Sequence, residues 1–499
     1  MVCLFQCSRQ IKVLIRLENP LRHSKPKGHH DTTFVIMKKL EDWINGKTKY
    51  ILIGIVVLGA ALRLYHINYQ SLWLDELYSI VPTDPQNSLV SIIEYAKGDQ
   101  PPLFFIYIHY VFALFGYNEL VGRTACAFIG VIGILAIYFL GKECHGKAAG
   151  LFAAFLTGLN YFHIYYSQEL RFYSMVFLFA VLSYLFFIRA FKRNKTIDFI
   201  GYAIFTVFLL YTHYFGVIIF LVQVLTFFFL LIYKRDFRFI VSSIISGIAI
   251  TIAFIPWMPI VINDSDITSG WIKRPDPFFV VKYFYDYTGK DVFTTLVFLI
   301  FIFLFILSME TKNSLSNESK PIYLIIILWI VFSYLLPYVW SIVNSPLLHQ
   351  RYTIVTLPAL ILLFALGWDR IRNNKWKYAL PPMLAMSLFI NMIFFKQHYT
   401  KLEKDQFREA SEVVKSNNKF HYPIYSVLSW HFNFYFRDSA DTVNSLYDSD
   451  LSSIETFWLL QAHYTPDEME AETGRLSKNF IVVEKYSLYG ANALLMKRK

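Results

Sequence analysis

The chain has 499 residues, of which 56% are hydrophobic and 17% are charged, and its formal net charge is +11. This balance excludes a disordered chain, which would be poor in apolar residues, and it argues against a single soluble core. The apolar residues are collected into runs with almost no charge, such as Ile51–Leu62, Ile322–Val339 and Tyr378–Phe395. Because a membrane span needs about 20 mostly apolar residues, the sequence predicts a mainly α-helical, polytopic membrane protein.

The positive charge does not indicate nucleic acid as a partner. Lys and Arg are concentrated in short clusters between apolar runs, where the preference for positive cytoplasmic loops explains them. The four cysteines lie outside long polar segments and predict no disulfide framework. The 48 Phe and 34 Tyr fit membrane packing and a bias in base composition, and platforms that stack against sugars are a second interpretation.

Residues 1–48 form a basic segment that we expect on the cytoplasmic side of the membrane. Residues 1–36 lack the pattern of a signal peptide, and Met37-Lys38-Lys39 resembles an ordinary translation start. Residues 1–36 are therefore either an upstream extension of the reading frame or a disordered cytoplasmic tail.

The transmembrane part is expected at residues 49–395. Basic clusters mark cytoplasmic loops, and they lie at the amino terminus and at Lys142–Lys147, Arg189–Lys195, Lys234–Arg238, Lys312–Lys320 and Arg370–Lys377. Placing these clusters inside predicts about eleven spans. The expected spans are residues 50–67, 122–141, 148–166, 172–188, 198–213, 215–233, 238–258, 291–308, 321–340, 352–368 and 378–395. The odd number places the amino terminus inside and the carboxyl terminus outside.

Residues 68–120 are expected to form one long external loop with helices at the membrane interface. Leu103–Phe115 is apolar but has only about 13 residues, the length of a re-entrant or interfacial helix. Counting it as a span would invert every later loop against the basic clusters. Within Leu89–Ala96 the apolar residues recur at helical spacing with polar residues between them, which predicts an amphipathic helix in the interface.

Residues 396–499 differ in composition, with about 13 basic and 14 acidic residues. The pattern predicts a helix at Phe407–Val414 and short strands at Ile424–Val427, Phe457–Gln461 and Phe480–Val483. We expect a small extracytoplasmic α/β domain, which acts either as a passive cap or in acceptor binding.

Conspicuous polar residues collect at the external ends of the predicted spans, although they are far apart in sequence. They are Trp73-Leu74-Asp75-Glu76, Asp99-Gln100-Pro101-Pro102, Arg123, Glu169-Leu170-Arg171-Phe172-Tyr173, Thr212-His213-Tyr214-Phe215 and His349-Gln350-Arg351-Tyr352. A charge near lipid is costly and usually faces the protein interior or a water-filled cavity. We therefore infer one external cavity lined by carboxylates and arginines.

Each group also has a purely structural interpretation. Asp75 could cap a helix that starts at Glu76, and Arg123 and Arg351 could extend toward the membrane interface. His213 could belong to an aromatic belt with Tyr214, and Glu169 could form a local ion pair with Arg171. The shared position of all groups on one side favours the common cavity.

This cavity predicts group transfer from an anionic, lipid-linked donor. Arginines bind phosphate through charge-assisted, bidentate hydrogen bonds, and a carboxylate can take the proton of an attacking hydroxyl group. Interfacial and re-entrant helices suit a lipid that enters sideways from the membrane. A transporter is the competing class, but it more often has charges near mid-membrane and paired halves, and it would not need an external domain of about 100 residues.

Several of these motifs resemble the GT-C glycosyltransferases, above all glycosyltransferase family 39 and its bacterial relatives. Those relatives include the dolichyl-phosphate-mannose protein mannosyltransferases and the aminoarabinose transferase of lipid A. The first external loop carries the most specific likeness, in Leu62-Arg63-Leu64-Tyr65, Ser71-Leu72-Trp73-Leu74-Asp75-Glu76 and Asp99-Gln100-Pro101-Pro102-Leu103. Weaker matches are Arg123, Glu169–Tyr173, Thr212–Tyr214 and Arg351-Tyr352 followed by Pro358. The resemblance covers about residues 50–400.

The resemblance implies a polyprenyl-phosphate sugar donor and transfer with inversion on the extracytoplasmic face. Asp75 matches the residue taken as the catalytic base, and Glu76 completes the acidic pair of the family. Asp99 and His213 match a metal-binding pair of a relative, so the resemblance implies a divalent metal ion as a possible cofactor. Many relatives have His where this chain has Gln100, which departs from the family pattern.

We therefore expect an integral glycosyltransferase of a bacterial inner membrane, which acts among membrane lipids on a protein, lipid or glycan acceptor. The donor phosphate and the substrate are assigned to Lys97, Arg123, Glu169, Arg171, Tyr173, His349, Arg351 and Tyr352. Two different functions stay open: a transferase that moves another lipid-linked group, such as a modified pentose, to lipid A, and a transporter of lipid or glycan.

Overall fold

The computed structural model describes residues 30–263, 272–310, 319–371 and 373–499. The chain divides into two compact units, Met1–Lys47 and Thr48–Lys499, and the second unit carries all the features discussed below. Predictions for residues 1–29, and most of the basic cluster Lys312–Lys320, lie outside the described residues.

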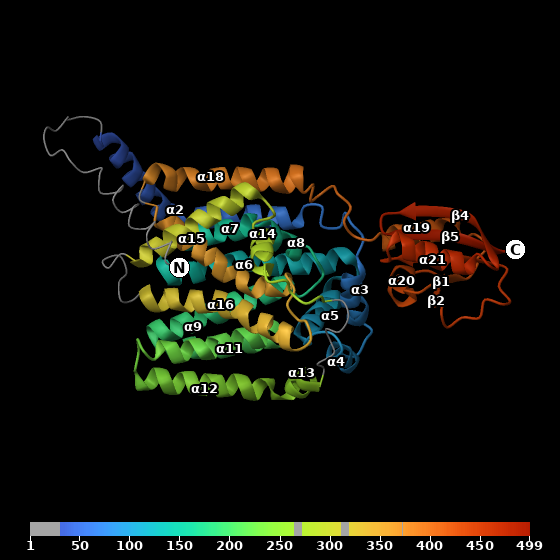
Figure 1. Ribbon diagram of the computed structural model, residues 1–499, viewed down its shortest axis with the longest axis horizontal. Coiled ribbons are helices and arrows are strands. Elements are labelled where there is room, and N and C mark those ends of the chain that lie inside the picture. Colours follow the sequence, from blue (N-terminus) through green and yellow to red (C-terminus); the bar gives the residue numbers. More distant parts are fainter. Residues whose placement is uncertain (1–29, 264–271, 311–318, 372) are drawn as a thin grey trace. The chain divides into compact units, whose positions relative to one another are not determined.

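Most of the described chain consists of helices (Figure 1). In chain order they are α2 (His30–Leu64), α3 (Leu74–Ile80), η1 (Val81–Thr83), α4 (Leu89–Lys97), α5 (Leu103–Phe115), α6 (Glu119–His145), α7 (Lys147–Leu159), α8 (Tyr161–Ser167), α9 (Tyr173–Arg193), α10 (Thr196–Leu210), α11 (Phe215–Leu230), α12 (Phe237–Phe254), η2 (Ile255–Trp257), α13 (Met258–Asn263), α14 (Phe279–Tyr287), α15 (Val292–Glu310), α16 (Ser319–Val343), η3 (Tyr352–Thr356), α17 (Leu357–Asp369), α18 (Asn374–Ile390) and η4 (Asn391–Phe395).

Six helical segments among the described residues are long and apolar enough to cross a membrane. They are Glu119–His145, Tyr173–Arg193, Phe237–Ile262, Ser319–Val343, Tyr352–Asp369 and Lys375–Phe395. Helices α14 and α15 form a further pair that is bent by 108°. Three other expected spans are the shorter apolar helices α7, α10 and α11. The mainly helical fold is as predicted, and the number of about eleven spans stays a prediction.

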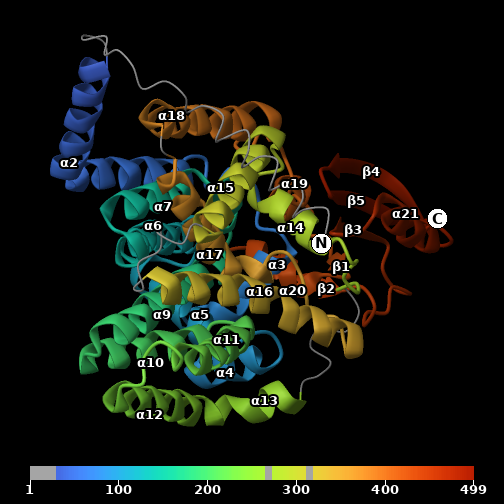
Figure 2. The same cartoon turned by 60° about the vertical axis from the view of Figure 1, so that its left-hand side comes forward.

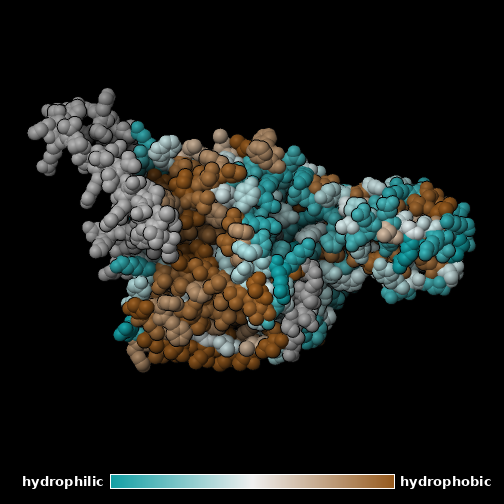
Figure 3. All heavy atoms as spheres, in the orientation of Figure 1, coloured by the Kyte–Doolittle hydropathy of each residue, from teal (hydrophilic) through white to brown (hydrophobic). Residues whose placement is uncertain are grey.

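The outer surface of the helices is apolar, as a lipid-facing surface must be. Figure 3 shows mainly hydrophobic residues over the sides of the helices and mainly hydrophilic residues, with some hydrophobic ones, over the carboxyl-terminal domain. On α12, for example, Ile244, Ile245, Ile248 and Ile252 are all about half exposed or more. Such a surface is stable next to acyl chains and costly next to water.

The segment between α2 and α6 folds into short helices that gather at one end of the bundle (Figures 1 and 2). Leu103–Phe115 is the 13-residue helix α5. In α4 Ile92 and Ala96 are buried, while Ser91 and Glu94 are exposed. This division between two faces is the amphipathic pattern that the sequence predicts for the segment.

The carboxyl-terminal residues form a five-stranded sheet with three helices, as expected for a small α/β domain. The elements are α19 (Phe407–Asn417), β1 (Ile424–Ser426), α20 (Ser429–Phe436), β2 (Val443–Ser445), β3 (Thr456–Ala462), α21 (Pro466–Leu476), β4 (Phe480–Leu488) and β5 (Ala491–Arg498). The strand order is β2-β1-β3-β5-β4. Strand β1 is parallel to β2 and β3, whereas β5 pairs antiparallel with β3 and β4. A core that includes Phe457, Leu459 and Leu494 holds the domain together.

The polar segment before and within α19 binds the chain that leads into α3. The side-chain oxygen of Gln70 accepts a hydrogen bond from the backbone N–H of Lys404 at 3.0 Å. The backbone N–H of Arg408 donates to Ser71 Oγ at 3.0 Å, and its guanidinium pairs with Glu119 at 2.6 Å. The carboxyl-terminal domain is therefore anchored beside the first loop of the bundle, which positions both for a shared site.

Candidate active site

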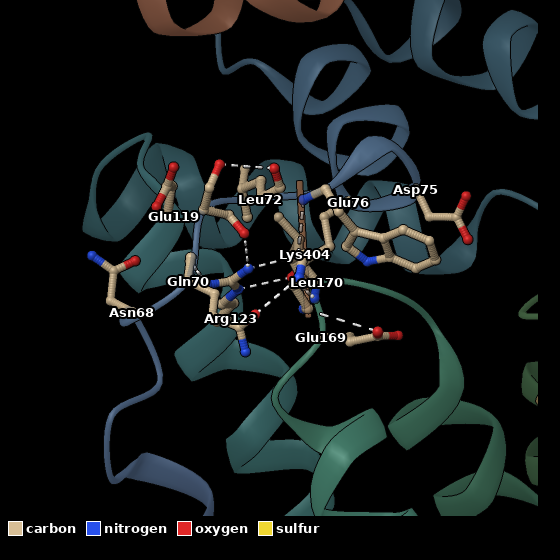
Figure 4. Close-up of polar contacts among 12 residues, drawn as sticks. Asn68, Gln70, Leu72, Asp75, Glu76, Glu119, Arg123, Glu169, Leu170 and Lys404 are labelled. Carbon is tan, nitrogen blue, oxygen red and sulfur yellow. Dashed lines mark hydrogen bonds and ion pairs between the residues drawn. The ribbon is translucent and has the colours of Figure 1, made fainter. Parts of the chain in front are cut away.

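Helix α3 places the two adjacent carboxylates, Asp75 and Glu76, on different sides of one short helix. The helix begins at Leu74, and its N-cap Trp73 has an extended backbone. The interpretation of Asp75 as the cap of a helix starting at Glu76 is therefore wrong. Because successive residues of an α-helix are rotated by about 100°, the two side chains diverge, as Figure 4 shows.

Glu76 lies in a closed pocket in which hydrogen-bond donors engage both carboxylate oxygens (Figure 4). Arg123 donates from Nε to Oε1 at 2.8 Å and from Nη2 to Oε2 at 2.6 Å. Lys404 Nζ donates to Oε2 at 2.9 Å, and the backbone N–H of Leu170 donates to Oε1 at 2.9 Å. Burial alone would raise the pKa of Glu76, but Arg123 and Lys404 lower it to about 2. Glu76 is therefore ionised and held by its neighbours.

Arg123 also fixes the backbone that enters α3. Its guanidinium donates to the carbonyl oxygens of Ile67 at 3.1 Å, Gln70 at 2.6 Å and Ser71 at 3.0 Å. The side chain is 1% exposed. All these contacts are internal, so Arg123 is a member of the Glu76 pocket, and its assignment to the donor phosphate stays a prediction.

Lys404 is a member of this pocket that the sequence does not predict. It comes from the segment after the last helix of the bundle, is 8% exposed, and lies 3.9 Å from Glu169 Oε1 as well as against Glu76. A single lysine in a polar tail carries no sequence signal for this role. Only the docking of the tail on the first loop brings it there.

Glu169 is a buried carboxyl group with unused hydrogen-bonding capacity. It is 1% exposed, and neither of its carboxylate oxygens has a hydrogen-bond partner among the described residues. Burial raises its pKa, Lys404 and Arg351 lower it, and the nearby charges of Glu76 and Asp75 raise it, with a result of about 7. A carboxyl group of this kind exchanges its proton near neutral pH.

Asp75 has a different environment, because its side chain is 24% exposed and its carboxylate forms an ion pair with Nη1 of Arg351. The guanidinium of Arg351 lies 5.5 Å from the centre of the Trp73 ring. Arg171 Nη1 donates to the backbone oxygen of Asp75 at 3.2 Å and lies 3.4 Å from Asp99 Oδ2. The structure thus brings Asp75, Arg171 and Arg351 together from three distant segments.

Glu169 and Arg171 contact each other through the backbone and not through the local ion pair that was the structural interpretation. The backbone N–H of Arg171 donates to the backbone oxygen of Glu169 at 2.8 Å. The Arg171 guanidinium instead reaches Ser79 Oγ at 3.1 Å and lies 4.6 Å from the centre of the Phe172 ring. Arg171 is therefore directed toward α3.

Tyr352 and the two histidines of the site form an aromatic group beside the arginines. The Tyr352 ring is 4.8 Å from the ring of His213 and 5.7 Å from that of His349. Burial, and then the charge of Arg171, lower the pKa of His213 to about 3, and burial with Arg351 lowers the pKa of His349 to about 4. Both imidazoles are therefore neutral near pH 7, whereas Arg171 and Arg351 beside them are charged.

Two further residues of the predicted set have different positions. Tyr173 is 1% exposed at the start of α9, close enough to Arg351 to interact with it electrostatically. Lys97 ends α4, where its half-exposed side chain pairs with Glu94. Tyr173 thus joins the arginine region, whereas the structure gives Lys97 a local partner on its own helix.

The structure does not assemble a metal site from the predicted pair. No group of three or more His, Cys, Asp and Glu side chains that could hold a metal ion occurs in the described ranges. Asp99 faces the cation Arg171, and His213 Nδ1 accepts a hydrogen bond from the backbone N–H of Phe215 at 3.0 Å. Two donors, one of them opposite an arginine, do not fit a protein metal centre, so we derive no step through a metal.

Comparisons with known proteins find one family model that matches part of the chain and several solved structures with a similar fold. A family model described as dolichyl-phosphate-mannose-protein mannosyltransferase matches residues 99–262. No curated protein sequence matches the chain. Crystal structures of ArnT from Cupriavidus metallidurans, in the apo state and bound to undecaprenyl phosphate, are similar with TM-scores of 0.63 and 0.60. Both are 12% identical and cover 92% and 89% of this chain and 98% and 97% of the ArnT chains.

The crystal structure of the Archaeoglobus fulgidus oligosaccharyltransferase in complex with Zn and sulfate is also similar. Its TM-score is 0.53 at 10% identity, over 89% of this chain and 72% of that chain. The chain therefore shares the fold of ArnT and of this oligosaccharyltransferase.

The family model and the solved structures match different lengths of the chain. The family model covers the segment with Asp99, Arg123, Arg171 and His213, and its match begins after Asp75 in the chain. The structural likeness extends over about nine tenths of the chain, including the carboxyl-terminal part. In this structure the ion pair with Arg351 holds the Asp75 side chain, and the catalytic role of Asp75 stays a prediction.

Proposed function

We propose that this protein is an integral-membrane glycosyltransferase that moves a sugar from a polyprenyl-phosphate donor to a hydroxyl group on the extracytoplasmic face. The observation that carries the proposal is the partly exposed Asp75 carboxylate of α3 at one end of an apolar helix bundle, where Arg351 pairs with the carboxylate and Arg171 binds the backbone oxygen of the same residue. The ArnT structure bound to undecaprenyl phosphate and an archaeal oligosaccharyltransferase with a dolichol-phosphate and an inhibitory peptide support the class of donor.

The reaction needs a base, a cationic site for phosphate and a route for the leaving group. The acceptor oxygen forms a bond to the anomeric carbon while the bond from that carbon to the phosphate oxygen breaks. Asp75 takes the acceptor proton, and the polyprenyl phosphate leaves with the electron pair. One displacement of this kind inverts the anomeric carbon.

The two arginines stabilise the charge that develops on the phosphate. Planar guanidinium groups match phosphate oxygens bidentately. Because Arg351 contacts Asp75 directly, a phosphate that binds this guanidinium and an acceptor held by Asp75 share one site. Glu76 holds the loop in place through Arg123 and Lys404, and we assign it positioning rather than proton transfer.

The proposed position of the site on the external side of the membrane can be tested by labelling single cysteines in intact cells. We expect cysteines at Gly98 and Ser477 to react with an impermeant reagent, and cysteines at Gly146, Asn194 and Asn373 to be protected, because basic loops stay inside. Labelling of Asn194→Cys from outside would contradict the proposed face of the reaction.

The function itself is tested with a panel of polyprenyl-phosphate sugars labelled in the sugar, hexoses and modified pentoses included. We expect purified protein to release label from one donor and to pass it to an acceptor that mass analysis identifies. An intact donor in every reaction, with label moved across a vesicle membrane, would instead establish a transporter.

A further inference from the structure

Aromatic side chains from two parts of the chain meet next to the candidate base. Tyr78 belongs to α3 and Tyr95 to α4, whereas Trp430 and His431 belong to α20 of the carboxyl-terminal domain. The Trp430 ring is 6.0 Å from Tyr78 and 6.3 Å from Tyr95, and its plane is 20° from parallel to that of Tyr95. Trp430 is 41% exposed and Tyr78 is 38% exposed, so parts of these rings face solvent.

His431 adds an unsatisfied polar group to this aromatic cluster. Its ring is 4.7 Å from Tyr78 in an edge-to-face arrangement and is 6% exposed. Neither ring nitrogen has a hydrogen-bond partner within the part of the chain that the structure describes. Burial lowers the pKa of His431 to about 4, with a smaller contribution from His463. At neutral pH the imidazole therefore offers one donor and one acceptor.

The cluster begins where the acceptor hydroxyl must lie. Tyr78 is three residues beyond Asp75 on α3, the spacing that places two side chains next to each other on a helix surface. After burial, the charges of Asp75 and Asp99 are the largest influences that raise the pKa of Tyr78. A group stacked on Tyr78 and Trp430 is thus adjacent to the base.

We infer that Tyr78, Tyr95, Trp430 and His431 form a subsite for a sugar ring of the acceptor, an inference that rests on the proposed function. The C–H groups of a sugar carry partial positive charge and pack against the electron-rich faces of aromatic rings, and the exposed parts of Tyr78 and Trp430 offer such faces. This assigns a glycan-bearing acceptor to the protein, in place of a polypeptide.

The structure favours the acceptor over the donor, and a sugar over a peptide. Trp430 and His431 come from the polar carboxyl-terminal domain, so their ligand approaches from water, whereas the donor is anchored in lipid. The residues of the subsite all lie on helices. Helices present no open strand edge to which an extended peptide could add.

The subsite can be tested by binding, without any transfer reaction. In protein labelled with 5-fluorotryptophan, the Trp430 resonance is assigned by its loss in Trp430→Phe. The probes are methyl glycosides of glucosamine, galactose and mannose, together with a blocked seryl peptide. We expect at least one glycoside to shift the Trp430 resonance saturably and the peptide to leave it unchanged. A peptide-induced shift alone, or no shift with any probe, would overturn the inference.

A kinetic arm then connects the subsite to the reaction. With the acceptor found in the donor panel, Trp430→Ala should raise KM for the acceptor roughly tenfold and leave KM for the donor unchanged, as loss of one stacking contact predicts. Trp430→Phe should restore most of the loss. Phe420→Ala, which removes a 77% exposed ring of the same domain, is the matched control and should not change either constant.

The two arms separate this inference from the proposed function. Glycoside binding at Trp430 in a protein that transfers no sugar would support the subsite and contradict the transferase. Normal transfer with an unchanged acceptor KM in Trp430→Ala would support the transferase and overturn the subsite. A thermal midpoint within about 2 °C of wild type shows that the variant is folded.

Discussion

Asp75 and Glu76 are neighbours in sequence and face opposite environments. Glu76 is fully buried and binds Arg123, Lys404 and a backbone N–H, so both of its oxygens have donors. Asp75 is a quarter exposed, and the ion partner of its carboxylate is Arg351, itself 13% exposed in its side chain. One carboxylate is closed off by the fold, and the other remains within reach of a substrate.

This difference explains why an acidic pair can serve both stability and chemistry. A buried carboxylate with excellent partners maintains a structure, and removing a partner leaves an uncompensated charge. A general base must instead reach the proton that it takes. Changes in the Glu76 pocket should therefore reduce stability first, while changes around Asp75 should reduce donor binding and transfer first.

The largest expected effect on stability follows from Arg123→Met. It leaves the Glu76 carboxylate buried with Lys404 as its remaining cation, and we expect a loss of about 3–5 kcal/mol in the free energy of unfolding. Thermal unfolding of the purified protein in detergent measures it. The triple variant Arg123→Met, Glu76→Leu and Lys404→Met should recover much of the loss, because packed apolar side chains replace the whole charged group.

The variant Arg123→Met can also contradict the division between the Glu76 pocket and the surroundings of Asp75. If Arg123→Met unfolds at the wild-type temperature but no longer binds undecaprenyl phosphate, then Arg123 belongs to the phosphate site that the sequence suggested. The division between a structural pocket and a reactive pocket would then be wrong.

A second prediction concerns the pH dependence that Glu169 gives to stability. Its pKa is about 7 in the folded protein against an ordinary value of 4.5. The folded state therefore keeps a proton that the unfolded chain loses as the pH rises through that range, and stability falls with rising pH. Glu169→Gln should remove up to about 3 kcal/mol of this fall.

The measurement is the thermal midpoint of wild type and Glu169→Gln at several pH values from 4.5 to 8. We expect the midpoint of the variant to rise relative to wild type as the pH increases. A constant difference between the two proteins over this range would show that Glu169 is ionised in the folded state already at low pH.

A smaller effect, on donor binding, is expected at Arg351, the ion partner of Asp75. Arg351→Lys keeps the positive charge but loses the planar pair of donors, so affinity for undecaprenyl phosphate should fall roughly tenfold with little change in stability. Calorimetric titration of the purified protein measures the affinity. Lys97→Ala is the matched control, since Lys97 pairs with Glu94 on its own helix. A larger loss of affinity in Lys97→Ala than in Arg351→Lys would show that the phosphate binds at α4 instead.

The sequence predicts those properties that depend on composition and periodicity. The apolar runs, the interfacial pattern of Leu89–Ala96 and the strands at Ile424 and Phe480 all appear as helices and strands at the expected positions. The same applies to the collection of Asp75, Arg171 and Arg351 at one site, because each sits at the same end of an apolar run.

The sequence does not predict contacts that depend on how distant segments dock. Lys404 enters the Glu76 pocket and Trp430 meets Tyr78 only because the carboxyl-terminal domain binds the first loop. The sequence also does not predict the different environments of Asp75 and Glu76. The start of α3 at Leu74 sets the directions of the two side chains, and Trp73 is not a residue type that indicates a helix start.

The most direct test of the proposed mechanism compares Asp75→Asn with Glu76→Gln in single-turnover transfer and in donor binding. Asn keeps the size of Asp and removes the proton acceptor, and a positioned general base contributes roughly 10²–10⁴-fold. We predict that Asp75→Asn folds, binds undecaprenyl phosphate and loses transfer by that factor, whereas Glu76→Gln loses stability and retains more transfer. Near-normal turnover in Asp75→Asn would contradict the mechanism, because it would show that Asp75 does not accept the proton.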